Sequence, residues 1–197
     1  MNEQSDTREL DREDMSELAA GNELALNRLM DRHGERILRF LSRILGDEQE
    51  AMDLTQEAFV RVYKHRHRFN PKQKFTTWLY AIGSNLSRDL IRWRKRHPAI
   101  PFSVVSRDQD TRFGDSKVDE RPCPKEQFIS NEEAILVKNA VGELPEDLRT
   151  PVILSEYEGR SHSEIALILN CSKKAVEMRL YRARKRLRDR LENILEL

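Results

Sequence analysis

The chain has 197 residues, of which 35% are charged and 38% hydrophobic, and its formal net charge is +1. This length holds one ordinary domain or two small ones, and so polar a composition favours small helical units over one large core. The apolar runs are too short to cross a bilayer, the N-terminus lacks the layout of a secretion signal, and two cysteines are too few for a disulfide framework or a four-cysteine zinc site. We therefore expect a cytoplasmic protein without direct membrane insertion.

The small net charge hides a strong segregation of charge along the chain. Residues 1–24 carry eight acids against two bases, whereas residues 61–97 hold eleven lysines and arginines against one acid. A second basic block, residues 173–190, has nine lysines and arginines and two acids. Either block alone is explained equally well by a solvated helix face. Two such blocks on a neutral chain predict two contact zones for a polyanion.

In chain order, we predict a flexible acidic tail over residues 1–10 and a helical unit over 11–97. Gly21-Asn22 and Gly46-Asp47 separate three helices, and the third opens on a capping pattern formed by Asp47 and Glu50. One side of this third helix is apolar and predicts a core face. The other side forms a mixed acidic and apolar strip of residues three and four apart: Asp53, Gln56, Glu57 and Val60.

Residues 61–96 interleave aromatic side chains with lysines and arginines, and Asn70-Pro71 ends the preceding helix. A helix over about 76–96 is expected to bury Leu79, Ile82, Leu86, Leu90 and Trp93, with Asn85, Arg88, Arg92 and Lys95 on its opposite face. Single-strand readers combine cations with ring faces for unstacked bases. Phe69 and Phe75 bracket a loop, where they either anchor it or form such a base pocket.

Residues 98–130 contain four prolines and no sustained helical period, which predicts a flexible linker. The second unit, 131–197, is also helical, so the fold class is all-α with two small helical domains. Pro145 suits the start of a helix and Gly159 its end, while Pro151 predicts a kink or a restart.

Residues 161–180 have the layout of a helix-turn-helix. A capping box of Ser161 and Glu164 starts its first helix, Asn170 occupies the turn, and Ser172 caps the second helix. Such a second helix enters the major groove of DNA, although a core helix pair with a basic face has a similar pattern. Its predicted outward residues are Lys173, Lys174, Glu177, Met178, Tyr181, Arg182 and Arg184.

Four segments, in order and around a linker, resemble the extracytoplasmic-function (ECF) group of the bacterial sigma-70 family. Members of this group are dissociable promoter-recognition subunits of RNA polymerase, with a sigma-2 and a sigma-4 domain. The resemblance covers nearly the whole chain and rests on DLTQEAFVRVYKH (53–65), FTTWLYAIGSNLSRDLIRWRKR (75–96), LPEDLRTPVILSEYEGRSHSEIALIL (144–169) and AVEMRLYRARKRLRDRL (175–191).

The resemblance implies roles for the residues already described. The strip at Asp53, Gln56, Glu57 and Val60 matches the segment that binds the β′ clamp helices of core RNA polymerase, and the linker would pass through a channel of that enzyme, whose β subunit is a further partner. Promoter DNA is the second partner, and an anti-sigma factor is a third that the family habit suggests. No catalytic activity, cofactor or metal is implied. The −35 element would be read by the helix over 172–186. The residues that match the part opening and reading the −10 element are Phe69, Lys72, Lys74, Phe75, Trp78, Asn85, Arg88 and Arg92.

The sequence departs from the family pattern at Glu177, where many members have a basic residue. A glutamate disfavours phosphate and guanine but accepts a hydrogen bond from cytosine N4. We therefore expect an altered −35 preference.

Two other classes of protein are alternatives to a sigma factor. A stand-alone helix-turn-helix regulator accounts for 161–187 but leaves the strip at Asp53 without a role. An enzyme would need a site such as Asp53 and Glu57 with His65 and His67, whose spacing matches no known metal-ligand pattern. For the cysteines, we expect Cys123 to be exposed in the linker and Cys171 to be structural rather than a redox sensor.

Overall fold

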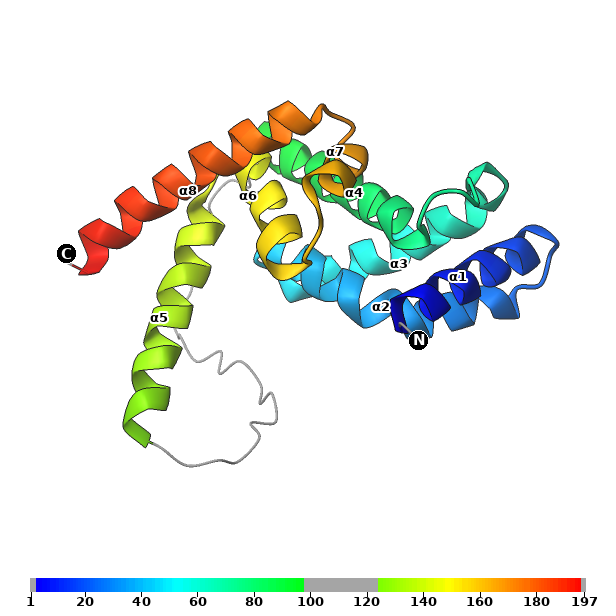
Figure 1. Ribbon diagram of the computed structural model, residues 1–197, viewed down its shortest axis with the longest axis horizontal. Helices are drawn as coiled ribbons and strands as arrows, with labels where there is room; N and C mark the ends of the chain where they lie inside the picture. Colours follow the sequence, from blue (N-terminus) through cyan, green and yellow to red (C-terminus); the bar gives the residue numbers. More distant parts are fainter. Residues whose placement is uncertain (1–2, 98–123, 196–197) are drawn as a thin grey trace.

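The computed structural model describes the backbone of residues 3–97 and 124–195, and every regular element in those two ranges is helical (Figure 1). The all-α prediction is therefore confirmed. None of the helices in this part of the chain is both long and apolar enough to cross a membrane. The elements of the first unit are α1 (Glu3–Ala19), α2 (Leu24–Leu45), α3 (Glu48–Lys64), the short 3₁₀ helix η1 (Arg66–Arg68) and α4 (Phe75–Arg96). Those of the second are α5 (Pro124–Glu143), α6 (Glu146–Val152), the π-helical turn η2 (Ile153–Tyr157), α7 (His162–Ile168) and α8 (Lys173–Leu195).

The element boundaries differ from the prediction at two places. Residues 3–10, expected within a flexible tail, belong to α1. The next turns of this helix are held against α2 by ion pairs of Asp11 and Asp14, which the sequence of α1 alone does not reveal. The second unit begins with α5 at Pro124 rather than at 131. The predicted linker is therefore shorter at its C-terminal end, and the rest of it, with Cys123, lies outside the described residues.

Helix α2 is the centre of the first unit and packs against α1, α3 and α4. Its apolar side is fully buried along its length, at Leu29, Ile37, Phe40, Leu41 and Ile44. This continuous stripe, at helical spacing, lets three other helices share one core.

The turns of the first unit follow local sequence signals. Gly46 ends α2 in the left-handed region, at φ +71°, and its amide donates to the Ser42 carbonyl. The Asp47 carboxylate then accepts from the Glu50 amide and caps α3 as predicted. Helix α4 crosses α2 at Gly83, where an added Cβ would lie 3.1 Å from Ile37 Cδ1. A side chain at this position would require the end of the Ile37 side chain to shift by a few tenths of an ångström.

The prediction that Trp93 is buried is wrong. Its side chain is 53% exposed and stacks on the His97 ring, with centroids 4.9 Å apart. Beyond Ser87, no residue of α4 within the described chain is buried, although Leu90 packs against the core in part. The apolar residues of α4 keep their helical spacing as far as Trp93, but no neighbouring helix in the described part of the chain buries this end of α4.

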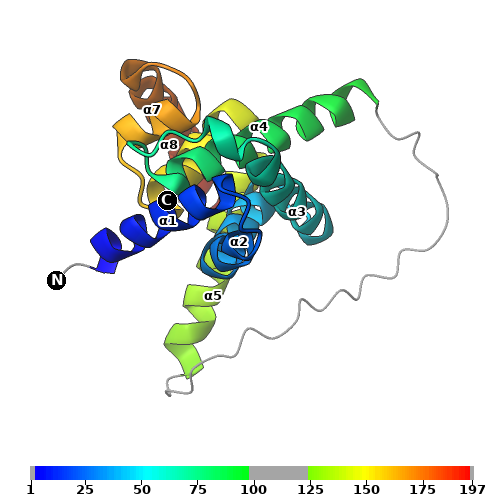
Figure 2. The same ribbon diagram turned by 90° about the vertical axis from the view of Figure 1, so that its right-hand side faces the viewer.

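In the second unit, α6 runs through Pro151 and continues directly into the π-helical turn η2, with Val152 and Ile153 both in the helical region. The chain therefore does not restart at Pro151; only the hydrogen-bond pattern of the helix changes after it. Gly159, at φ +61°, ends this turn, and α7 and α8 follow as a helix pair. Helix α5 extends away from the body of the molecule (Figures 1 and 2). The C-terminal half of α8 also extends away from it (Figure 1). The exposed character of α8 beyond Ala183 agrees with that arrangement.

The capping box of α7 gives a first testable prediction. The Ser161 hydroxyl accepts from the Glu164 amide, and the Glu164 carboxylate accepts from the Ser161 amide at 3.0 Å. Replacing Ser161 with alanine is expected to lower the free energy of unfolding by about 1 kcal/mol, because a helix-end donor loses its partner. Urea unfolding followed by circular dichroism measures this loss. The control is Ser163→Ala, two positions into the same helix and exposed; an equal effect in both variants would contradict the assignment of the cap.

Candidate nucleic-acid interface

The acidic strip predicted on α3 lies at the surface. Asp53, Gln56 and Val60 are exposed, and Glu57 is partly covered because it accepts from Arg61 Nε at 2.9 Å. The apolar residues on the other side of α3 are buried in the shared core. The strip therefore presents carboxylates around an apolar residue that is 41% exposed, a surface suited to arginines of a partner protein.

The loop between α3 and α4 is built on a cluster of aromatic rings. Phe69 is half-buried and lies with its ring centroid 5.3 Å from that of Trp78 and 6.2 Å from that of Phe75. Phe75 itself is only 2% exposed and contacts the His33 ring, so it anchors the loop to α2. Phe69 and Trp78 are left as the ring faces within reach of solvent.

The tip of this loop is a tight polar turn. The Asn70 side chain accepts from the Lys72 amide at 3.0 Å, and its carbonyl accepts from the Gln73 amide at 2.9 Å. Pro71 and Lys72 are exposed at the tip. The loop is therefore fixed by local hydrogen bonds while its lysine faces solvent.

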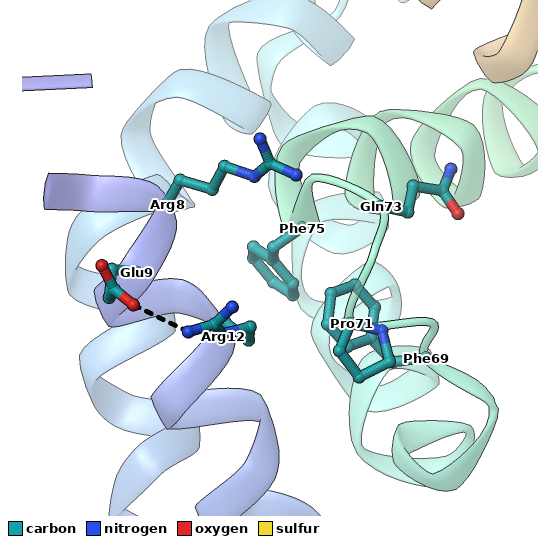
Figure 3. A pocket seen from close by; sticks show the side chains of 7 residues that line it. All are labelled: Arg8, Glu9, Arg12, Phe69, Pro71, Gln73 and Phe75. Atoms are coloured by element: carbon teal, nitrogen blue, oxygen red, sulfur yellow. Dashed lines mark hydrogen bonds and ion pairs between the residues drawn. The ribbon is translucent and has the colours of Figure 1, made fainter. Parts of the chain in front are cut away.

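Two adjoining cavities separate this loop from α1. One has a volume of about 320 Å³ and the other about 480 Å³, and both are lined by Arg12, Phe69 and Pro71. Figure 3 shows the first, where Arg8 reaches from α1 toward the loop and Arg12 lies one turn further along the helix. Neither arginine was predicted as a site residue. The sequence feature that could have indicated them is that they are the two bases of an acidic segment and lie four residues apart.

The outer face of α4 carries the polar residues predicted for it. Asn85 and Arg92 are exposed, and Arg88 is partly buried. Arg88 Nη1 donates to Asn85 Oδ1 and its Nε donates to Glu146 Oε1, both at 3.3 Å. Amide and guanidinium groups thus lie along one helix face, next to the second unit.

The helix-turn-helix is formed as the sequence predicts. Asn170 adopts φ +48°, the Ser172 hydroxyl accepts from the Ala175 amide at 3.2 Å, and Val176 and Leu180 are buried against α7. Cys171 is partly buried, and Arg179 Nη1 lies 3.7 Å from its sulfur. Every outward residue predicted on α8 is exposed: Lys173, Lys174, Glu177, Met178, Tyr181, Arg182 and Arg184.

Two of these α8 residues have acidic or basic neighbours. Arg184 pairs with Glu156 at 3.1 Å, and both side chains are more than half exposed. The Glu177 carboxylate lies 3.9 Å from His162 Nδ1, beyond hydrogen-bonding distance. Glu177 is therefore a solvent-exposed negative charge among the lysines and arginines of α8.

No group of three or more histidine, cysteine or acidic side chains in the described ranges is arranged to hold a metal ion. This includes Asp53 and Glu57 with His65 and His67, the set considered for a metal enzyme.

Comparison with known proteins decides the family. Residues 29–97 match Sigma-70 region 2, and residues 135–187 match Sigma-70 region 4. The RNA polymerase sigma-H factor of Pseudomonas aeruginosa is 31% identical over 189 residues, which are 96% of this chain and 97% of that protein. The ECF RNA polymerase sigma factor SigW of Bacillus subtilis is 30% identical over 91% of this chain and 96% of its own length. The chain belongs to the ECF group of the sigma-70 family.

The solved structure of CnrH, in complex with the cytosolic domain of CnrY, resembles this sigma factor in fold. The TM-score is 0.67 at 27% sequence identity, with 93% of this chain and 98% of CnrH covered. The likeness therefore extends over both helical units.

In this sigma factor, the region 2 and region 4 units meet around one buried carboxylate. The Glu158 side chain, 3% exposed, follows the π-helical turn and points to α2 and α4. It accepts from the Tyr80 hydroxyl at 2.5 Å and from Arg36 Nε at 3.1 Å, and Arg43 Nη1 lies 3.6 Å away. Burial, together with this carboxylate, raises the pKa of Tyr80 far above its ordinary value. The Tyr80 hydroxyl therefore stays a donor to Glu158 at every pH at which the protein is handled.

The rim of this junction engages cations that were predicted to contact DNA. Lys74 Nζ pairs with Glu164 at 2.8 Å, and Arg88 pairs with Glu146 at 3.3 Å. Burial opposes ionisation of Glu164, but hydrogen bonds from Lys74 and Ser161 outweigh it and lower the pKa of this carboxyl to about 2. Arg149 Nη1 also donates to the Ile44 carbonyl at 2.6 Å. The face of region 2 that was predicted to read the −10 element is thus partly covered by region 4.

The junction gives a second prediction. Tyr80→Phe is expected to lower the free energy of unfolding by about 1.5–3 kcal/mol, because a hydrogen bond to a buried charged group is lost. Urea unfolding monitored by tryptophan fluorescence and circular dichroism measures the change. Tyr63→Phe is the matched control, since it removes a hydrogen bond to Glu23 that lies at the surface, and it should cost clearly less. Equal effects of the two substitutions would show that the Glu158 contact adds nothing particular to stability.

Proposed function

We propose that this ECF sigma factor binds core RNA polymerase, reads the −35 and −10 promoter elements and promotes promoter melting. The observation that carries the proposal is the presence, on one chain of this family, of two separate exposed cationic faces, on α8 and on the loop and outer face of α4. Two faces of this kind suit two stretches of one DNA molecule.

The α3 strip is the proposed contact with the polymerase. The carboxylates of Asp53 and Glu57 surround Val60, and charge complementarity of this kind favours the arginines of the β′ clamp helices. The names of the relatives link them to RNA polymerase, which supports a polymerase partner for this chain as well.

The proposed −10 site lies on the loop and on α4. A base that leaves the duplex would stack against the half-buried Phe69, and Lys72 would neutralise phosphate nearby. Asn85 offers an amide and Arg92 a guanidinium further along α4. Holding an extruded base would keep the strands apart without ATP, because the binding energy offsets the cost of unpairing.

The pairs of Lys74 with Glu164 and of Arg88 with Glu146 imply a competition. A phosphate and a carboxylate cannot both neutralise the same cation, so promoter DNA that engages these two residues would displace the acids of region 4. We therefore propose that the two units move apart when the sigma factor engages promoter and polymerase. A protein that binds the sigma factor itself, such as an anti-sigma factor, is a further proposed partner, since CnrH was solved in complex with the cytosolic domain of another protein, CnrY.

A third prediction tests the polymerase contact. With core polymerase, the full chain should direct initiation from a genomic promoter library, and Asp53→Ala should raise the Kd for core polymerase about tenfold or more, since its partner charge is left unpaired. Glu48→Ala, at an exposed position on another side of the same helix, should leave the Kd unchanged. The stand-alone regulator predicts the opposite pattern: a shift of promoter DNA by the chain alone and no dependence on polymerase.

A fourth prediction concerns the −35 element. Glu177→Arg is expected to change the sequences selected from a randomised −35 library, because the carboxylate that accepts from cytosine N4 is replaced by a group that favours guanine. The comparison is made with the parent chain in the same holoenzyme. Identical selected sequences would refute a role for Glu177 in specificity.

A further inference from the structure

The groove between α1 and the 66–75 loop has the composition of a site for an unstacked nucleotide. Its loop side is apolar, with Phe69 and Pro71 shared by both cavities. Its α1 side carries Arg8 and Arg12, and Arg66 lines the second cavity from the loop end. The two volumes, about 320 and 480 Å³, lie within the range of small-ligand sites, roughly 300–1,000 Å³.

Helix α1 is held in place by its acids. Asp11 is 3% and Asp14 5% exposed, and both face α2. Arg32 donates to Asp11 at 2.5 Å and to Asp14 at 2.8 Å, and Arg28 donates to Asp14 at 2.6 Å. His33 Nε2 lies 2.7 Å from Asp11 Oδ1. Buried carboxylates with several partners fix the orientation of a helix, because any other position would leave charges unpaired.

This attachment leaves the arginines of α1 facing the groove. Arg8 Nη2 donates to the Lys72 carbonyl at the loop tip, 3.2 Å away, which links α1 to the loop across the first cavity (Figure 3). Arg12 pairs with Glu9, but both side chains are more than half exposed. An exposed pair of this kind contributes little, so a phosphate can replace Glu9 at small cost.

The groove also contains acids, so the sign of its net charge depends on the numbers of acidic and cationic side chains that line it. Glu9 lines the first cavity and Glu13 the second, against three arginines and His67. The cations remain in excess even with a neutral histidine. On α1 the two arginines are matched in number by Glu9 and Glu13, and the excess of one cation comes from Arg66 at the loop end. An apolar side and an excess of cations are the two features with which proteins bind single-stranded nucleic acid.

We propose that α1 is the second wall of a site for single-stranded DNA, in which Arg8 and Arg12 bind backbone phosphates of the strand whose base lies against Phe69. The proposal rests on the −10 role of the loop described above. It assigns DNA-binding residues to a segment whose sequence is strongly acidic, because Asp11, Asp14 and Glu17 are paired with arginines of α2, whereas Arg8 and Arg12 line the groove.

The test uses the full chain assembled with core polymerase. The probe is a fluorescein-labelled strand of about 12 nucleotides, the non-template −10 sequence of a promoter selected from the library, and its Kd is measured by anisotropy over a range of KCl concentrations. The double substitution Arg8→Gln and Arg12→Gln is expected to raise the Kd on the order of tenfold and to reduce the slope of log K against log salt by about 1.4, since each lost phosphate contact on a single strand removes about 0.7. Lysine at both positions should restore most of the slope.

The matched control is Arg39→Gln on α2, an exposed arginine that pairs with Glu35 within its own helix, as Arg12 does with Glu9. It should change neither quantity. If the glutamine variants bind as tightly as the parent while Phe69→Ala weakens binding, the proposal for α1 is wrong and the −10 role of the loop stands. If neither has an effect, the −10 role itself fails. A weaker Kd with an unchanged salt slope and no rescue by lysine would mean that α1 merely supports the loop, which also overturns the proposal.

Discussion

The buried carboxylate of Glu158 is the constraint on which the arrangement of the two units depends. A charge taken out of water needs donors on several sides, and here they come from α4 through Tyr80 and from α2 through Arg36 and Arg43. The Arg160 guanidinium, 4.7 Å from the Tyr80 ring centroid, covers the same tyrosine. Because Tyr80 is fixed in the region 2 core and the two arginines reach the same carboxylate from α2, region 4 can dock in few orientations without stranding a charge.

This docking has different effects on the two surfaces that are proposed to bind DNA. The outward side of α8 lies away from the junction, and its lysines, Tyr181 and Arg182 are all exposed. On region 2, by contrast, Lys74 and Arg88 are held by acids of region 4. The surface proposed for the −35 element is therefore open in this arrangement, whereas the one proposed for the −10 element is partly neutralised by carboxylates from the same chain.

Local features of this fold could be predicted from the sequence, and features that depend on distant contacts could not. The caps at Asp47 and Ser161 and the left-handed turn at Asn170 each involve neighbours within a few residues, and all three are confirmed. Trp93 is exposed because the helices that pack against α4 end before this residue. The spacing of apolar residues in α4 does not indicate where those helices end. The same holds for Glu158, whose partner Tyr80 is 78 positions away, and for the acids of α1, which are paired with arginines of α2.

The pairing of acids also explains how a nearly neutral chain presents cationic surfaces. Asp11 and Asp14 are neutralised inside region 2, Glu158 is neutralised at the junction, and Asp53 and Glu57 of α3 lie on one strip. What remains on α8 and on the loop is mostly positive, and in the groove three arginines face two glutamates. At short range, the electrostatic attraction to DNA depends on these local surfaces. At long range, it depends on the net charge of the chain. A net charge of +1 gives the free chain little long-range attraction to DNA. The local surfaces keep the positive charge that is needed for contact when a larger partner brings a promoter to them.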